Sequence, residues 1–315
     1  GPALYAAGTF NDAGGEPANH IAKWDGSSWS TLGDGTNSSV FAMTAFDDGS
    51  GPALYAGGSF LEAGGIPARR IARWDGLSWS ALGSGIDGGG GPVSALVTFD
   101  DGTGESLFAG GQFTEAGDES ASRIAKWDGS SWTPVGSGVD GLSLLSLSVF
   151  DDGSGLALFA GGRFSEAGGS PATNIAKWDG TTWSPLGTGV DDGVFAMTAY
   201  DDGSGEKLYS VGEFTVAGGR NVLKVAKWDG STWSPLQTQN LGVTGSVRAL
   251  VEHDDGSGRA LYAAGEFIRA GGETANRIAR WDGSDWYPLE SGLSSGARAL
   301  ATFDDGSGES LIVGG

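Results

Sequence analysis

Residues 54–99 read LYAGGSFLEAGGIPARRIARWDGLSWSALGSGIDGGGGPVSALVTF, and close variants of this stretch fill the chain. Its two tryptophans are five residues apart, and the pair occurs six times, as Trp24/Trp29, Trp74/Trp79, Trp127/Trp132, Trp178/Trp183, Trp228/Trp233 and Trp281/Trp286. The leucine that opens the stretch recurs every 50 to 53 residues, at Leu4, Leu54, Leu107, Leu158, Leu208, Leu261 and Leu311. An internal repeat of this length is considered first because it dictates the architecture.

Each repeat contains four short apolar runs bounded by Gly, Pro, Asp or Ser, a pattern that predicts strands rather than helices. We call these strands a, b, c and d; in one repeat they read VFAMTAF, ALYAGG, IARWD and SWSALG. The motif D-D-G-S-G joins a to b, and W-D-G-S-S-W joins c to d. Asp-Gly between two apolar runs is a strong hairpin signal, so consecutive strands are expected to be antiparallel.

Four antiparallel strands repeated six times predict an all-β fold, a six-bladed β-propeller that forms a single domain over residues 1–315. A solenoid is the rival architecture. Each indole can bury about 150–250 Å², so we expect the tryptophans to form the core between blades. We expect the cation that precedes each strand-c tryptophan to lie along the outer sheet surface.

The order of strands at the two ends of the chain predicts how the ring closes. The chain begins with strands b, c and d and ends with a and b, so a C-terminal strand a (residues 297–304) is expected to complete the first blade and remove an open edge. The final strand b, residues 311–315, is then redundant with residues 4–8. The opening Gly1-Pro2-Ala3-Leu4 matches Gly51-Pro52-Ala53-Leu54, which suggests a fragment of a longer protein.

Composition narrows the range of partners. The 315 residues include 59 glycines, no cysteine and a formal net charge of −21. A surface this acidic repels nucleic acids and anionic membranes. No run approaches the ~18 apolar residues of a membrane-spanning helix. We therefore expect a monomeric ring that neither binds nucleic acid nor inserts into a membrane.

The order of an apolar strand, an L-Y-x-G-G strand, a strand ending in W-D-G and a tryptophan strand resembles the kelch repeat. The doublet Gly57-Gly58, Trp74 at the kelch tyrosine position and Trp79 at the kelch tryptophan position carry the match in one repeat. The pattern departs from kelch in having Trp for Tyr and an added F-x-E-A-G-G-x-P-A segment. It also looks like repeats of secreted bacterial propeller proteins and, more distantly, of fungal cell-surface polarity markers. These resemblances imply an extracellular interaction scaffold.

Length differences between repeats fall only between strand d and the next strand a. Because strands alternate in direction, the d–a and b–c connections should emerge on one face, and variable loops on a rigid scaffold often bind partners. The fifth repeat is the most deviant. The candidate partner-binding residues follow the glycine doublet (Arg163, Glu213, Glu266), lie in the fifth repeat (Arg220, Asn221, Lys224, Gln237, Gln239, Asn240) or lie in other d–a loops (Asp87, Asp140, Asp191).

Parts of the sequence resemble three specific kinds of site. The D-D-G-S-G segments could bind calcium, but a hairpin turn is the favoured interpretation. Adjacent acids on an extended chain face opposite ways, so their carboxylates do not converge on one ion. A glycoside hydrolase would need one distinct pair of carboxylates, whereas Glu62, Glu115 and Glu166 recur around the repeats. A lectin could use repeated Trp, Lys or Arg, and Glu residues for multivalent sugar binding.

The sequence therefore favours a non-catalytic recognition or structural module of a secreted or cell-surface bacterial protein, with no cofactor. Its partner would be a protein or a glycan, bound through the d–a and b–c loops. A carbohydrate-binding propeller and, less favoured, a glycoside hydrolase remain as alternatives.

Overall fold

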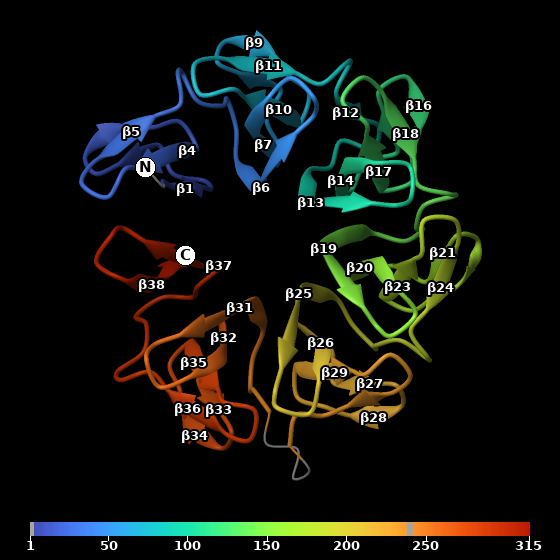
Figure 1. Cartoon of the computed structure of the whole chain (residues 1–315), viewed down its shortest axis with the longest axis vertical. Helices are drawn as coiled ribbons and strands as arrows, with labels where there is room; N and C mark the ends of the chain where they lie inside the picture. The colour runs from blue at the N-terminus through green and yellow to red at the C-terminus, as the bar shows by residue number, and fades with distance from the viewer. Residues whose placement is uncertain (1–2, 238–241) are drawn as a thin grey trace. The chain divides into compact units, whose positions relative to one another are not determined.

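A computed structural model describes residues 3–237 and 242–315, and every regular element in these two ranges is a β-strand. No helix in this part of the chain is long and apolar enough to cross a membrane. Within the described residues, seven sheets built from the a to d strands follow one another along the chain, and each pairs its strands in sequence order, as the repeat predicts (Figure 1). The fold is all-β and built from antiparallel sheets.

Five sheets have four strands, in the order a, b, c, d. They are β6 (Val40–Asp47), β7 (Pro52–Gly58), β10 (Ile71–Trp74) and β11 (Trp79–Ala81); β13 (Val93–Asp100), β14 (Glu105–Gly111), β17 (Ile124–Trp127) and β18 (Trp132–Pro134); β19 (Ser143–Asp151), β20 (Leu156–Arg163), β23 (Ile175–Trp178) and β24 (Trp183–Pro185); β25 (Val194–Asp201), β26 (Glu206–Gly212), β29 (Val225–Trp228) and β30 (Trp233–Ser234); and β31 (Val247–Asp254), β32 (Arg259–Gly265), β35 (Ile278–Trp281) and β36 (Trp286–Pro288).

The two ends of the chain carry shorter sheets. The first sheet contains only strands b, c and d, namely β1 (Leu4–Ala7), β4 (Ile21–Trp24) and β5 (Trp29–Thr31). The last contains only strands a and b, namely β37 (Ala299–Asp304) and β38 (Glu309–Gly314), which pair with each other. Each end thus has an incomplete sheet, and the strand predicted to complete the first blade, β37, pairs with β38 in this structure.

Contacts divide the chain into two compact units. One comprises Gly1–Leu147, Glu166–Ser170 and Gly180–Trp183, and the other comprises Ser148–Ser165, Pro171–Asp179 and Ser184–Gly315. Within each unit the a strands of successive sheets pack against one another: β6 against β13 in the first, and β25 against β31 and β31 against β37 in the second.

A two-stranded hairpin inside every b–c connection was not predicted. In the second sheet it is formed by β8 (Glu62–Ala63) and β9 (Ile66–Pro67), around Gly64 and Gly65 with φ of 58° and 76°. Two consecutive positive φ angles suit a tight hairpin turn. The equivalents are β2 (Asp12–Ala13) with β3 (Glu16–Pro17), β15 (Glu115–Ala116) with β16 (Glu119–Ser120), β21 (Glu166–Ala167) with β22 (Ser170–Pro171), β27 (Val216–Ala217) with β28 (Arg220–Asn221), and β33 (Arg269–Ala270) with β34 (Glu273–Thr274).

The tryptophan pairs form the core between successive sheets, which confirms the prediction. The rings of Trp127 and Trp132 lie 5.4 Å apart, and both side chains are buried. The indole N–H of Trp132 donates a hydrogen bond to the carbonyl of Leu82 in the preceding repeat (3.0 Å). The same bond recurs from Trp79, Trp183 and Trp233. Four d-strand indoles therefore fasten their sheets to the previous one.

The glycine of the W-D-G turn fits under the preceding repeat. A Cβ atom on Gly129 would lie 2.6 Å from the carbonyl oxygen of Asp48, in the a–b turn of the previous sheet. A Cβ atom added to Gly180, Gly230 or Gly283 would likewise lie closest to the carbonyl oxygen of Asp101, Asp152 or Asp202, respectively. Gly76 has open space instead, because the first sheet has no strand a and hence no a–b turn before it.

The aspartate of the same turn accepts hydrogen bonds from the backbone. Its lowered pKa predicts that the stability of the protein falls in acid. Ser131 N–H and Ser130 N–H each donate to Asp128 Oδ1 at 2.8 Å. The bond from Ser131 is the largest influence, and together these bonds outweigh burial and lower the pKa of Asp128 from 3.8 to about 2. A lowered folded-state pKa gives stability that is present above pH ~4 and lost as the pH falls towards ~2.

We therefore expect Asp128→Asn to be less stable than the wild type at pH 7, because a neutral amide accepts weaker hydrogen bonds than a carboxylate. The difference should shrink as the pH falls from ~4 to ~2, where the wild-type carboxylate becomes protonated. Urea unfolding at a series of pH values measures it. A difference that stays constant down to pH ~2 would contradict this account of the turn.

Candidate functional site

The d–a and b–c connections lie together, as expected. The d–a segment pairs with the b–c hairpin of the next sheet through β12 (Ile86–Asp87) and β15, and through single bridges elsewhere, such as Thr36 with Ala63 and Val190 with Ala217. The connections on which the sequence placed partner binding therefore form one local surface at each such junction.

One part of this surface, in the second unit, is centred on Phe195. Phe195 lies in a β-bulge near the start of β25, where the register with β26 shifts between Val194 and Ala196. The guanidinium carbon of Arg248 lies 4.6 Å from the centre of its ring, and that of Arg163 lies 5.8 Å away. Arg248 occupies the same bulge position in β31. Bulges of this kind re-aim side chains next to functional sites.

Carboxylates surround the two arginines. Arg163 forms ion pairs with Glu213 and, at 3.4 Å, with Asp192. Arg248 is 3.5 Å from Glu266, an ion pair at the limit of a hydrogen bond. We call Arg163, Asp192, Phe195, Glu213, Arg248 and Glu266 the Phe195 cluster; it joins the fourth, fifth and sixth repeats.

The Phe195 cluster remains accessible to a partner. The side chains of Asp192 and Glu266 are about half exposed, at 48% and 50%, and that of Arg248 is 29% exposed. The Nε of Arg248 is buried and has no hydrogen-bond acceptor among the described residues. Arg248 thus uses little of its five-donor capacity, and its planar fork suits a carboxylate.

Lys224 extends the cluster and marks the deviation of the fifth repeat. It has a left-handed backbone (φ 66°), and its Nζ donates to the backbone carbonyl of Glu213 at 2.6 Å. In four other repeats an arginine or asparagine at this position donates to a carbonyl sixteen residues later, as Arg123 does to Val139. Four sequence-predicted candidates, Arg163, Glu213, Glu266 and Lys224, therefore come together.

The d–a aspartates hold the loops in place. Asp191 Oδ1 accepts hydrogen bonds from the N–H groups of Thr215 and Val216, at 2.7 and 2.8 Å. Burial raises the pKa of Asp191, but these bonds outweigh it and leave the pKa below its usual value. Asp140 accepts from Glu166 N–H at 2.7 Å.

Asp87 differs from these two in forming ion pairs with Arg70 and Arg69, at 2.7 and 3.2 Å. The hydrogen bond from Arg70 is the largest influence and lowers the pKa of Asp87. All three d–a aspartates, Asp87, Asp140 and Asp191, thus have partners within the chain.

The remaining candidates lie apart from the Phe195 cluster. Arg220 and Asn221 form the exposed strand β28. Gln237 Nε2 donates to the carbonyl of Ser284 at 3.1 Å and to the carboxylate of Asp285 at 3.0 Å. Gln239 and Asn240 lie outside the described residues.

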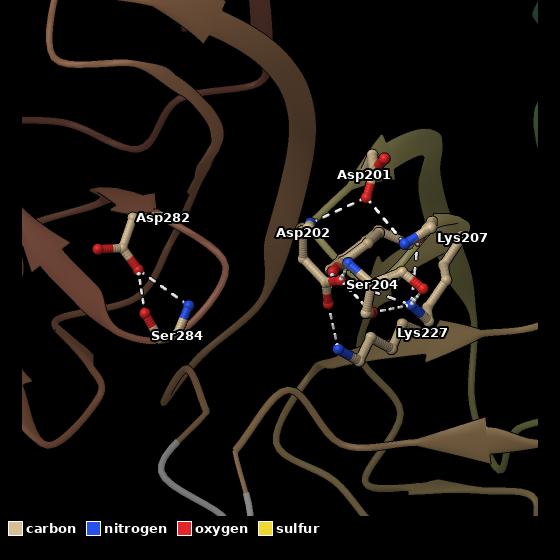
Figure 2. Close-up of polar contacts among 10 residues, drawn as sticks. Asp201, Asp202, Ser204, Lys207, Lys227, Asp282 and Ser284 are labelled. Atoms are coloured by element: carbon tan, nitrogen blue, oxygen red, sulfur yellow. Dashed lines mark hydrogen bonds and ion pairs between the residues drawn. The ribbon is translucent and has the colours of Figure 1, made fainter.

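The D-D-G-S-G acids are used in turns, at the opposite ends of the strands. Asp201 accepts from the N–H groups of Gly203 and Gly205, while Asp202 contacts Lys207 and Lys227 (Figure 2). The two neighbouring carboxylates bind different groups, as the sequence argument expected. No group of three or more acids or histidines that could hold a metal occurs within residues 3–237 and 242–315.

The expectation for the strand-c cation was wrong. Lys126, Lys177 and Lys227 form ion pairs with the second aspartate of their own a–b turn, at 2.6 and 2.7 Å for the first two, and only 14–17% of each lysine side chain is exposed. The a–b turn folds over strand b and places its carboxylate within reach of strand c. A sugar site built on Trp, cation and Glu is therefore not assembled, since the indoles are mostly buried and these cations are paired.

Sequence reasoning missed Phe195, Arg248 and Asp192. A signal was present, because the second residue of strand a has four different identities in six strands: Phe41, Ser94, Leu145, Phe195, Arg248 and Arg298. A position that varies this widely within an otherwise regular strand is not required by the fold.

No protein-family model and no curated protein matches this sequence. Solved structures similar to the chain include the extracellular domain of a hybrid two-component system from B. thetaiotaomicron, with a TM-score of 0.46 and 8% identity over 83% of this chain and 35% of that one. A GH74 xyloglucanase from Xanthomonas campestris has a TM-score of 0.44 and 16% identity, covering 94% of this chain and 41% of that one. The Niastella koreensis GH74 enzyme has a TM-score of 0.36 and 14% identity, covering 80% and 45%. The chain spans less than half the length of each of these structures.

Proposed function

We propose that the chain is a six-bladed, kelch-like β-propeller in which β37 completes the first blade. It would act as a non-catalytic interaction module of a secreted or cell-surface bacterial protein. The sequential four-stranded sheets and the packing of successive a strands within each unit support the propeller. The extracellular setting rests on the resemblance of the repeats to secreted propeller proteins.

The observation that carries the interaction role is the Phe195 cluster. Other repeats have Thr, Ser or Gln where Arg163, Glu213 and Glu266 stand, so the fold does not require these charges. Three successive repeats nevertheless bring them around one aromatic ring on a partly exposed surface. Arginine stacked on an aromatic ring is common where proteins recognise partners. The partner would be a protein surface that offers a carboxylate to Arg248.

The test compares Arg248→Ala with Arg259→Ala on protein and glycan arrays. Arg259 is in the same unit and forms an exposed ion pair with Glu252, but it lies at the a–b end of strand β32. We expect binding of at least one protein partner to weaken at least about tenfold in Arg248→Ala and to be unchanged in Arg259→Ala. Binding that is insensitive to Arg248, or lost equally in both variants, would contradict the proposal, as would turnover of a glycan.

A carbohydrate-binding module is the second candidate, and one observation favours it. Two successive repeat junctions in the first unit contain polar cavities of about 410 and 360 Å³, within the ~300–1,000 Å³ range of small-molecule sites. If the protein binds glycan spots on the arrays and no protein spots, the carbohydrate-binding candidate is favoured over the protein-binding one.

A further inference from the structure

The cavity at the junction of the first and second repeats differs from its neighbours at one position. Each repeat has a non-glycine residue with a left-handed backbone just before strand c, with φ between 63° and 69°. In four repeats its side chain crosses the junction and donates to a carbonyl sixteen residues later: Arg70 to Ile86, Arg123 to Val139, Asn174 to Val190 and Arg277 to Leu293. In the first repeat this residue is His20.

His20 makes no such bond. Its Nδ1 is buried and has no hydrogen-bond partner among the described residues. The carbonyl that corresponds by spacing belongs to Thr36, and the Nδ1 of His20 does not bond to it. A polar ring nitrogen is therefore left without a partner, and a buried polar atom without a hydrogen bond is costly.

His20 lines the cavity of about 410 Å³, together with polar side chains from both repeats: Asn11, Asn19, Asp34, Thr36, Asn37 and Glu62. Several of these are available to a ligand. The carboxylates of Asp34 and Glu62 have no hydrogen-bond or ion-pair partner within the described part of the chain, and Asn19 uses only its amide N–H, in a bond to the Asp34 carbonyl. The cavity thus offers acceptors from carboxylates and amides, and an imidazole that can donate or accept.

This set of groups fits a ligand with several hydroxyl groups, each of which can donate and accept. An anionic ligand is disfavoured, because the cavity contains two carboxylates and no cation, in a chain of net charge −21. We propose that this cavity binds a neutral sugar unit that contacts the imidazole of His20 and hydrogen-bonds to the open carboxylates of Asp34 and Glu62. The site is one of the two cavities that support the carbohydrate-binding candidate, on which this proposal rests, and it is separate from the Phe195 cluster.

The next junction provides an internal comparison. Its cavity is lined by Arg69, Ser84, Asp87, Glu115 and Asp118, among others. There Arg70 already occupies the crossing position and Asp87 is paired with both arginines. The counterparts of His20 and Asp34 at this junction, Arg70 and Ser84, hydrogen-bond within the protein, so this cavity should bind neutral sugars more weakly.

The chain has only two histidines, so imidazole signals in NMR spectra report on the site directly. His253 is the internal reference, because it is buried with its Nδ1 3.0 Å from Glu309. The probes are D-glucose, D-galactose, D-mannose and N-acetylglucosamine, with D-glucuronate and calcium chloride as charged comparisons. We expect at least one neutral sugar to shift the His20 signals saturably and to leave those of His253 unchanged.

The matched variant is His20→Arg, which restores the residue that spans the junction in other repeats. It should donate to the Thr36 carbonyl, fold at least as stably as the wild type and fill the cavity. Sugar affinity should fall at least about tenfold, the loss expected when a ligand hydrogen bond and its space are removed. Partner binding that depends on Arg248 should be unaffected, which separates this test from that of the proposed function.

Three outcomes would overturn the proposal: no neutral sugar shifts the His20 signals, only glucuronate or calcium shifts them, or sugar binding persists in His20→Arg. A calcium response alone would assign the carboxylates of Asp34 and Glu62 to a cation instead.

Discussion

Gly129→Ala should destabilise the protein more than Gly76→Ala, although the two glycines occupy the same turn of successive repeats with nearly equal φ angles, 98° and 99°. Alanine at such an angle costs about 1–2 kcal/mol in either position. Only at Gly129 does the added methyl group also meet the carbonyl oxygen of Asp48, at 2.6 Å. Overpacking of this kind adds about 1–3 kcal/mol.

The difference between the two variants isolates the contact between successive repeats. Urea unfolding curves give the free energy of unfolding of each variant. We expect a loss of about 1–2 kcal/mol for Gly76→Ala and of about 2–5 kcal/mol for Gly129→Ala. Equal losses would mean that the W-D-G turn of one repeat does not pack under the a–b turn of the preceding one.

Trp132→Ala should lower the free energy of unfolding by about as much as Gly129→Ala, about 3–5 kcal/mol, because it removes a buried indole between two sheets. Its indole also makes the 3.0 Å hydrogen bond to the Leu82 carbonyl of the preceding repeat. The loss should therefore weaken the connection between repeats as well as the core of one sheet. Unfolding followed by tryptophan fluorescence and by circular dichroism measures both.

Phenylalanine substitutions separate the hydrogen bond from the packing. Trp286 is equally buried, but its indole N–H has no acceptor among the described residues. Trp132→Phe should lower the free energy of unfolding by about 0.5–1.5 kcal/mol more than Trp286→Phe does, because one hydrogen bond contributes about this much to stability. If Trp286→Phe is the more destabilising of the two, the indole bond is not what fastens the sheets.

Local features of the fold could be predicted because the sequence repeats them. Asp-Gly turns, apolar runs of strand length and paired tryptophans each occur six times, and each has one structural explanation. The hairpin within the b–c connection was missed because its strands, such as Glu62–Ala63, are only two residues long. Periodicity cannot be detected in two residues.

Contacts that join distant residues could not be predicted in the same way. Lys177 and Asp152 are 25 residues apart, and nothing in the sequence around either one shows that the a–b turn folds back over strand b. The Phe195 cluster depends on a bulge in strand a, which leaves no mark in composition. Arg163, Glu213 and Glu266 were found because they break the repeat, whereas Phe195 and Arg248 were overlooked because they lie within a strand.

The most direct test of the proposed closed ring is a cross-link between its two ends. By analogy with the pairing of Ala45 and Leu54 between β6 and β7, closure would put β1 in the place of β38 beside β37, so that Thr302, which faces Leu311 of β38 in this structure, would lie opposite Leu4. The chain has no cysteine, so a variant with both Leu4→Cys and Thr302→Cys can form only one disulfide within a molecule. We expect the oxidised monomer to form this bond nearly completely, with a higher unfolding midpoint. A protein that stays reduced under mild oxidation, or that links only between molecules, would contradict the closed ring.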